Sequence, residues 1–275
     1  PQEIEYLLDI MQELRRNGKT IILITHKLEE VKKIADRCAI LRRGKLIKVL
    51  DVSRTSTLEM ANLMVGKEFS FDINKTPARC GDVVLDVEHL SVRSENKVEV
   101  VHDVSFKVHQ GEIFAIAGVS GNGQKELLVA LSGEDVRSPA GSIHMGDVDV
   151  AALHPGERRK LGLHFVPEER LGRGAVPTLG LAHNMLLTRD EAISNPGFAG
   201  GWINLRKLEA QAADIIKRFN VKAGGPNSAA KSLSGGNLQK FIVGREIAAG
   251  PKLLIVSQPT WGVDVGAAAQ IRGAI

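Results

Sequence analysis

Two glycine-rich stretches of the sequence could each bind a phosphate group. In such turns the backbone N–H groups curl around phosphate oxygens, and the general P-loop pattern G-x-x-x-x-G-K-[ST] adds a lysine for charge and a hydroxyl for Mg²⁺. Gln124 stands at the lysine position here, and Lys125 stands at the hydroxyl position. The first stretch is therefore either a degenerate phosphate-binding loop or a plain strand-to-helix turn. It consists of Gly118, Val119, Ser120, Gly121, Asn122 and Gly123.

The second stretch lies before a predicted helix and consists of Leu233, Ser234, Gly235, Gly236 and Asn237. A helix N-terminus exposes unpaired N–H groups and the positive end of the helix dipole, and both favour an anion. The alternative is that Ser234 is an ordinary N-cap. The order of the motifs favours phosphate binding, because the glycine-rich loop precedes this stretch and the apolar run Leu253–Val256 and a turn with Asp264 follow it.

The N-terminal part predicts helix, strand, helix and hairpin. Apolar residues at helical spacing extend to about Arg16. The β-branched run Thr20–Thr25, which ends at His26, is typical of a buried parallel strand. A helix is predicted over 28–36, followed by a β-hairpin with strands 38–41 and 45–49 around Gly44.

The remaining sequence predicts a second α/β unit. Periodicity is lost over Lys67–Val83, which indicates a linker. A buried strand over Ile113–Ala117 should lead into the glycine-rich loop. The alternation of strands and helices argues for a mainly parallel sheet. The other expected elements are strands over 84–87, 98–108 and 252–256 and helices from 123, over 205–219 and over 238–248.

Composition limits the function classes. Hydrophobic residues make up 43% and charged residues 25%, as in ordinary globular proteins, and no apolar run approaches the ~20 residues of a membrane span. The net charge of +4 is scattered, which gives no support to nucleic-acid binding. Cys38 and Cys80 have no metal-ligand spacing, so no metal site is expected. Because the chain starts at Pro1 and stops within a predicted helix, we expect a fragment of a longer protein.

These motifs, in this order, resemble the nucleotide-binding domain of ABC transporters. Leu233–Asn237 is similar to the signature motif, and Asp264 lies in the place of the D-loop. Ser257 and Gln258 occupy the positions of the Walker B Asp and Glu, which in the family organise Mg²⁺ and polarise the attacking water. Glu168 stands where the Q-loop usually has Gln.

Residues 1–66 resemble the C-terminal part of another such domain, with His26 in the place of the H-loop His that contacts the γ-phosphate. The resemblance implies a P-loop NTPase-like α/β fold with a parallel-sheet core, an antiparallel β layer and a helical subdomain over about 168–232. It also implies a linker over 67–83 and a second domain over 84–275 that lacks its C-terminal end. The order is similar to ATPase subunits of bacterial sugar and nucleoside importers, which fuse two domains.

The resemblance implies one competent site and one degenerate site. ABC domains pair head to tail, so Ser234, Gly235 and Gly236 would contact the γ-phosphate of ATP, with Mg²⁺, at the first domain's P-loop, and His26 would approach it from the other side. The glycine-rich loop with Gln124 and Lys125 would bind nucleotide at most and hydrolyse ATP negligibly. We therefore expect ATPase activity of the intact protein and none of this fragment.

The same resemblance implies partners. These are two membrane permease subunits, an extracytoplasmic solute-binding protein or lipoprotein, and a second nucleotide-binding subunit, but no nucleic acid. The protein would sit peripherally on the cytoplasmic face of the membrane. The motifs are more similar to nucleoside-type than to ribose-type importers. Trp261 could be a docking residue or a packing residue, and we expect packing. A soluble ABC protein acting on ribosomes or nucleic acid, and a non-hydrolysing scaffold, stay open as alternatives.

Overall fold

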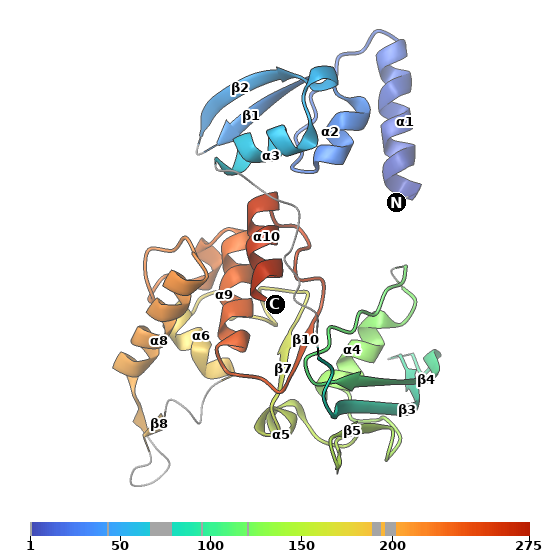
Figure 1. Ribbon diagram of the computed structural model, residues 1–275, viewed down its shortest axis with the longest axis vertical. Helices are drawn as coiled ribbons and strands as arrows, with labels where there is room; N and C mark the ends of the chain where they lie inside the picture. The colour runs from blue at the N-terminus through green and yellow to red at the C-terminus, as the bar shows by residue number, and fades with distance from the viewer. Residues whose placement is uncertain are drawn as a thin grey trace. The chain divides into compact units, whose positions relative to one another are not determined.

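The computed structural model describes residues 2–42, 44–66, 79–94, 96–119, 121–188, 194–195 and 202–275. The chain divides into two units, of which the first comprises Pro1–Asn74 with Val263–Gly273 and the second comprises Lys75–Gly262 with Ala274–Ile275 (Figure 1). None of the described helices is long and apolar enough to cross a bilayer.

The first unit packs short helices against a β-hairpin. The hairpin pairs β1 (Arg37–Arg42) with β2 (Lys45–Asp51) in antiparallel register, and Gly44 takes a left-handed φ of 73° at the turn. Its core consists of Leu28, Val31, Ile40, Leu50, Val52, Met60 and Ala61. The helices are α1 (Gln2–Arg16), α2 (Leu28–Ile34), the 3₁₀ turn Val52–Arg54, α3 (Thr57–Val65) and α10 (Val265–Ala274). The predicted helices near the N-terminus and the hairpin are confirmed.

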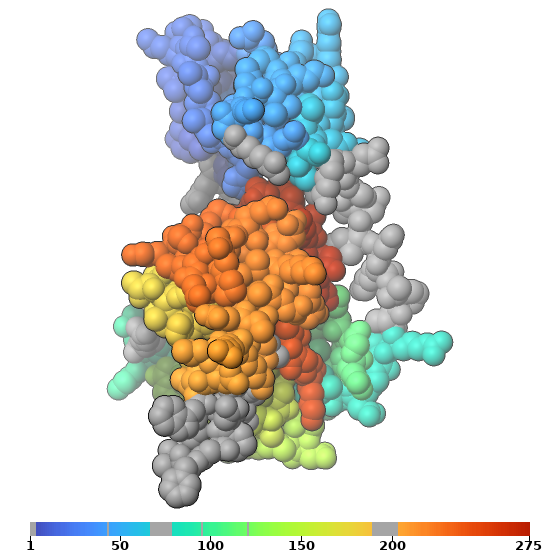
Figure 2. Space-filling view, turned by 90° about the vertical axis from the view of Figure 1, so that its left-hand side faces the viewer, coloured from blue at the N-terminus to red at the C-terminus, as the bar shows by residue number. Residues whose placement is uncertain are grey.

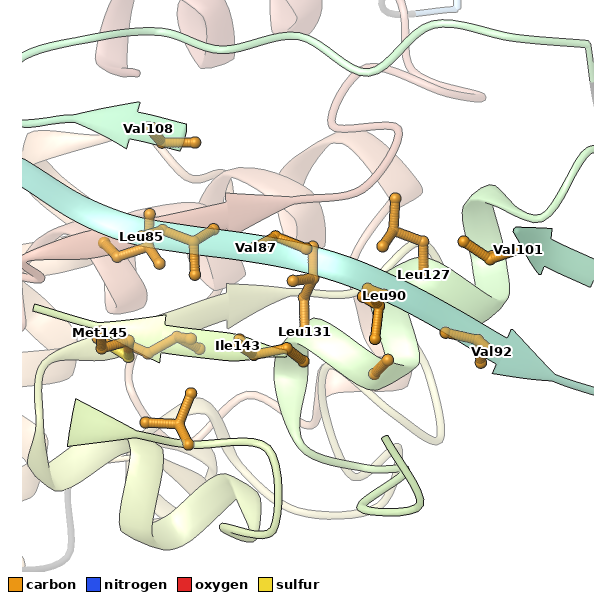
Figure 3. Packing of buried hydrophobic residues seen from close by; sticks show 14 residues of the cluster. Leu85, Val87, Leu90, Val92, Val101, Val108, Leu127, Leu131, Ile143 and Met145 are labelled. Carbon is orange, nitrogen blue, oxygen red and sulfur yellow. The ribbon is translucent and has the colours of Figure 1, made fainter. Parts of the chain in front are cut away.

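The second unit contains an antiparallel sheet in the order β4-β3-β5-β6. The two long strands, β3 (Val83–Arg93) and β4 (Glu99–His109), confirm and extend the predicted strands. The short strands are β5 (Ile143–Met145) and β6 (Val148–Asp149). The helix α4 (Gln124–Ser132) packs on this sheet through Leu127 and Leu131, which join a core that includes Leu85, Val87 and Leu90 (Figure 3).

A parallel pair and a group of helices complete the second unit. β7 (Leu163–Val166) pairs with β10 (Leu253–Val256) in parallel, from Leu253 beside Leu163 to Val256 beside Val166. α8 (Leu205–Arg218) buries only one stripe, Leu208, Ala212 and Ile215, and its other face belongs to the surface (orange in Figure 2). The remaining elements are α5 (Pro155–Lys160), α6 (Leu181–Asn184), the 3₁₀ turns Met185–Leu187 and Ala230–Ser232, β8 (Ser194–Asn195), β9 (Trp202–Ile203) and α9 (Gly235–Ile247).

A buried arginine holds the C-terminal end of α4. The guanidinium of Arg158 is fully buried, and it donates to the carbonyls of Ala130 and Leu131 at 2.7 and 2.8 Å. It also donates to the carbonyls of Leu153 and Ala151. A cation at a helix C-terminus stabilises the helix dipole and satisfies the last carbonyls. Desolvation lowers the pKa of Arg158 to about 10, so its charge persists at neutral pH.

Two predicted strands are wrong. The segments 20–25 and 113–117 belong to no strand, and Ile22 and Ile24 are 89% and 94% exposed, while Ile113 is 64% exposed. A β-branched run forms a strand only where a neighbouring strand accepts its backbone hydrogen bonds, and β-propensity by itself does not supply that neighbour. Among the described residues the parallel pairing involves β7 and β10 only. The predicted linker lies mostly outside the described residues, since 67–78 are not among them.

Candidate functional site

The glycine-rich loop between residue 117 and α4 has a conformation that requires glycine. Gly121 and Gly123 take left-handed φ angles of 91° and 88°. A Cβ on Gly123 would lie 2.5 Å from the carbonyl oxygen of Val100, so a side chain there would collide with β4. Gly123 also stands at the N-cap of α4 without a side-chain cap. The backbone therefore keeps a turn at a helix N-terminus, while Ser120 lies outside the described residues.

Gln124 turns back over this loop. Its Nε2 donates to the carbonyl oxygen of Val119 at 3.0 Å, and the N–H of Asn122 donates to the same oxygen at 3.3 Å. A Cβ on Gly118 would collide with the Gln124 amide. A neutral amide therefore covers the loop at the point where the P-loop pattern has a cation, and Lys125 is exposed one residue further along the helix.

The end of β10 has no carboxylate. The N–H of Ser257 donates to the Val166 carbonyl at 2.9 Å, which prolongs the pairing with β7 by one residue. Gln258 follows with a left-handed φ of 45°, and its carbonyl accepts from the N–H of Trp261 at 3.0 Å. In the described part of the chain no group of three or more His, Cys, Asp or Glu residues could hold a metal ion. The two residues directly after β10, Ser257 and Gln258, are uncharged, and Glu168 after β7 is exposed.

The second glycine-rich stretch forms the N-terminus of α9. Ser234 occupies the N-cap position, but its side chain makes no capping hydrogen bond to the helix. Instead, Asn237 Nδ2 donates to Ser234 Oγ at 2.8 Å. The interpretation of Ser234 as an ordinary N-cap is therefore wrong. The first N–H groups of a helix have no partner within it, so α9 has uncapped donors at the half-buried Gly235 and at Gly236, which is buried.

Arg170 connects three segments around this helix end. Its Nε donates to Gln239 Oε1 on α9 at 3.2 Å, and its Nη2 donates to the carbonyl oxygen of Trp261. A Cβ on Gly235 would lie 2.7 Å from Arg170 Nη1, so a side chain there would displace the end of the Arg170 side chain. Desolvation lowers the pKa of Arg170. Trp261 itself is 64% exposed, so the expectation that it packs in the interior is wrong.

A buried polar network joins β7 to α9. His164 Nδ1 lies 2.8 Å from Glu246 Oε2, and Arg245 Nε donates to Glu246 Oε1 at 2.7 Å. Arg245 also donates to the carbonyl of Asn184, the last residue of α6, at 3.0 Å. Burial alone would raise the pKa of Glu246, but the hydrogen bonds from His164 and Arg245 hold that pKa below its ordinary value. The network therefore contains a buried, ionised carboxylate.

Sequence analysis missed Arg170 and this network. Two signals in the sequence indicated that these groups need buried partners. One is a histidine inside the apolar run Leu163–Val166, and the other is the adjacent Arg245–Glu246 pair on a helix without a polar face. Arg170 had no comparable signal, because its partners are distant in sequence.

The predicted site residues fall into separate groups. Gly118, Val119, Gly121, Gly123 and Gln124 form the loop before α4, and Ser234–Asn237 form the N-terminus of α9. No hydrogen bond or ion pair between described residues joins these two groups. His26 is exposed in the first unit, where Asp264 caps α10 by accepting from the N–H of Ala267 at 2.9 Å.

Comparison with known proteins gives a consistent result. A family model described as ABC transporter matches residues 101–261. The chain is 39% identical over 97% of its length to the nucleoside import ATP-binding protein NupA of Lactococcus lactis subsp. cremoris (strain MG1363), covering 52% of that protein. It is 40% identical over 97% to the guanosine import ATP-binding protein NupO and 36% identical over 98% to the ribose import ATP-binding protein RbsA, both of Bacillus subtilis (strain 168), covering 52% and 53% of them. The chain thus spans about half the length of these curated relatives.

Solved structures show the same fold. The ATP-binding cassette MJ0796 bound to ADP and Pi superimposes with a TM-score of 0.57 at 20% identity, over 69% of this chain and 80% of that chain. The ATP-binding cassette MJ1267 gives a TM-score of 0.57 at 21% identity, over 70% of this chain and 76% of that one. The predicted fold class, an ABC nucleotide-binding domain of the P-loop NTPase type, is confirmed.

Proposed function

The chain belongs to the ABC transporter family, and from this premise we propose that it is part of an importer's ATP-binding subunit that couples ATP hydrolysis to uptake of a nucleoside or sugar. The relatives described above are named as import ATP-binding proteins for nucleosides, guanosine and ribose. The identities of 39% and 40% to the two nucleoside-type proteins, against 36% for the ribose-type protein, support a nucleoside as substrate.

The proposed organisation is the end of one nucleotide-binding domain, over residues 1–66, followed by a linker and by most of a second domain over 84–275. Two observations support it. The chain spans about half the length of its relatives. In addition, one boundary between the two units of the structure falls after residue 74, within the proposed linker, while Val263–Gly273 of the proposed second domain group with the first unit.

The contrast between the two glycine-rich stretches supports the proposal of one competent and one degenerate nucleotide site. At the loop before α4, the neutral Gln124 amide lies over the backbone, and Ser257 and Gln258 at the end of β10 supply no acid to hold Mg²⁺. These residues do not fit a hydrolytic site for MgATP, which needs a cation for the phosphates and an acid near the metal. At α9, by contrast, uncapped N–H groups fit a phosphate. Ser234, Gly235 and Gly236 would therefore close over ATP held by the first domain, with His26 approaching the γ-phosphate.

The remaining assignments follow from this role. ATP and Mg²⁺ would bind at the competent site of the intact protein. The donors at the N-terminus of α9 would contact the phosphates of this ATP. Its partners would be two permease subunits, a solute-binding protein or lipoprotein and a second nucleotide-binding subunit. The protein itself would lie at the cytoplasmic face of the membrane. The exposed face of α8 is a candidate for contact with a permease subunit.

Steady-state ATPase assays test the proposal. The intact protein, which includes the upstream half, should hydrolyse ATP, whereas the purified 275-residue chain should not. In the intact protein, Ser234→Ala removes one charge-assisted hydrogen bond to the γ-phosphate and should lower kcat/KM about 10- to 100-fold. ATP hydrolysis by the 275-residue chain, or full activity of the Ser234→Ala protein, would contradict the proposed roles.

Uptake of labelled guanosine in cells with and without the gene tests the substrate class. Membrane co-fractionation separates transport from a soluble role.

A further inference from the structure

The side chain of Asn237 sets the direction in which the Ser234 hydroxyl can bond. We propose that Asn237 is a positioning residue that makes Ser234 a hydrogen-bond donor toward the γ-phosphate, an inference that rests on the proposed function of the α9 N-terminus. Three groups form a chain of hydrogen bonds: the backbone N–H of Lys222, the amide of Asn237 and the hydroxyl of Ser234.

The direction of this chain is unambiguous. A backbone N–H can only donate, so the Lys222 N–H, at 2.9 Å from Asn237 Oδ1, must face the oxygen end of the amide. The NH₂ end then faces Ser234 and donates to its Oγ at 2.8 Å. Because Oγ accepts this hydrogen bond, the Ser234 O–H is left to point away from Asn237. The contact with the Lys222 N–H therefore identifies the oxygen end and the NH₂ end of the Asn237 amide.

The donor that starts the chain is firmly held. Val221, next to Lys222, is buried, and its N–H donates to the carbonyl of Ile216 in α8 at 2.9 Å. Lys240 Nζ donates to the carbonyl of Asn220 at 2.5 Å, which ties the same segment to α9. The segment after α8 thus presents the Lys222 N–H to Asn237 in one place. This rigidity is what allows a half-buried amide to orient an exposed hydroxyl.

The arrangement produces a cluster of donors. In an ordinary N-cap the serine oxygen accepts from a backbone N–H of the first turn and so consumes one helix donor. Here the Asn237 side chain takes that place, and the exposed Ser234 O–H and the N–H of the half-buried Gly235 remain for a ligand. A group that only accepts hydrogen bonds, such as the unprotonated γ-phosphate, fits this cluster.

The test compares four variants of the intact protein by kcat/KM for MgATP. Asn237→Asp keeps the shape but offers only acceptors: one oxygen accepts from the Lys222 N–H, and the other draws the Ser234 O–H inward and places a negative charge beside the phosphate. We expect a loss at least as large as the 10- to 100-fold loss expected for Ser234→Ala. Asn237→Ala leaves the hydroxyl free to rotate and should cause a smaller loss. Asn204→Asp, which preserves the acceptor that caps α8, is the matched control and should leave kcat/KM unchanged.

The double variant Ser234→Ala/Asn237→Ala decides whether Asn237 acts through Ser234. We expect its kcat/KM to equal that of Ser234→Ala within about twofold, because the residue to be positioned is gone. A purely structural role of Asn237 would instead make the two losses multiply, and that result overturns the inference. An Asn237→Asp protein as active as the wild type overturns it as well. Thermal unfolding of each variant shows whether it is folded. If Ser234→Ala alone has no effect, the proposed function fails, which is a different outcome.

Discussion

At the scale of single residues, the loop before α4 differs from a nucleotide site mainly by two side chains. The backbone of Gly121 and Gly123 has the left-handed turns of a phosphate-binding loop, but the Gln124 amide covers it. We predict that Gln124→Lys with Lys125→Ser tightens MgATP binding to the 275-residue chain at least about fivefold, since an ion pair at 4 Å contributes ~1–4 kcal/mol. Titration calorimetry measures this change.

Gln124→Ala is the control for this variant, because it uncovers the loop without adding charge. It should tighten binding less than the double change does. Neither variant should hydrolyse ATP, since Ser257 and Gln258 supply no acid. Equal affinities of the double variant and the wild type, with both folded, would show that the loop itself cannot hold phosphates.

At the scale of elements, the buried carboxylate of Glu246 holds β7 and α9 together. Its folded pKa lies below its ordinary value of 4.5, so its contribution to stability is full above pH 4.5 and is lost as the pH falls through the folded pKa. Glu246→Gln turns an NH₂ group toward His164 or Arg245 and should cost about 3–5 kcal/mol at pH 7, as for other broken buried ion pairs. The difference in unfolding free energy from wild type should shrink as the pH falls below 4.5.

Urea unfolding between pH 7 and pH 4 measures this difference. Glu88→Gln is the matched control, because the exposed Glu88 lies 3.7 Å from Lys107 Nζ in a surface ion pair. Such pairs contribute about 0–1 kcal/mol, so this variant should stay close to wild type at both pH values. A pH-independent cost of Glu246→Gln would mean that Glu246 is not ionised in the folded protein.

At the scale of the whole molecule, the chain exposes apolar segments that the proposed intact protein should cover. Ile22 and Ile24 are almost fully exposed in the first unit, and Ile113 and Val119 are 64% and 71% exposed in the second. Exposed apolar segments of this kind mark interaction sites or aggregation hazards. We predict that the 275-residue chain binds the dye ANS and that Ile22→Ser/Ile24→Ser lowers the fluorescence.

Leu46→Ser is the control for the dye experiment, because Leu46 is 61% exposed on the paired strand β2. It should change the fluorescence less than the double serine variant. The intact protein should bind less dye per molecule than the 275-residue chain. Equal dye binding by the two would contradict the proposal that the missing half covers these segments.

Much of the local structure was predictable because short-range geometry determines it. The spacing of apolar residues predicted α1 and α8, and Gly44 predicted the turn of the hairpin. The glycine-rich stretches before α4 and α9 were recognisable because only glycine adopts their backbone or permits their close packing. The absence of strands over 20–25 and 113–117 was not predictable, since strand formation depends on neighbours far away in sequence.

The sequence by itself therefore determined the family, the helices α1, α2, α4, α8 and α9 and the positions of both glycine-rich stretches, because these depend on residue types at short spacing. Only the tertiary structure decided what the polar side chains do. It turned Gln124 over its own loop, directed Asn237 at Ser234 instead of leaving Ser234 to cap α9, and buried Glu246 between His164 and Arg245. Hydrogen bonds are directional and short, so the folded geometry chooses their partners, both among nearby residues, as for Gln124 and Asn237, and between distant segments, as for His164 and Glu246.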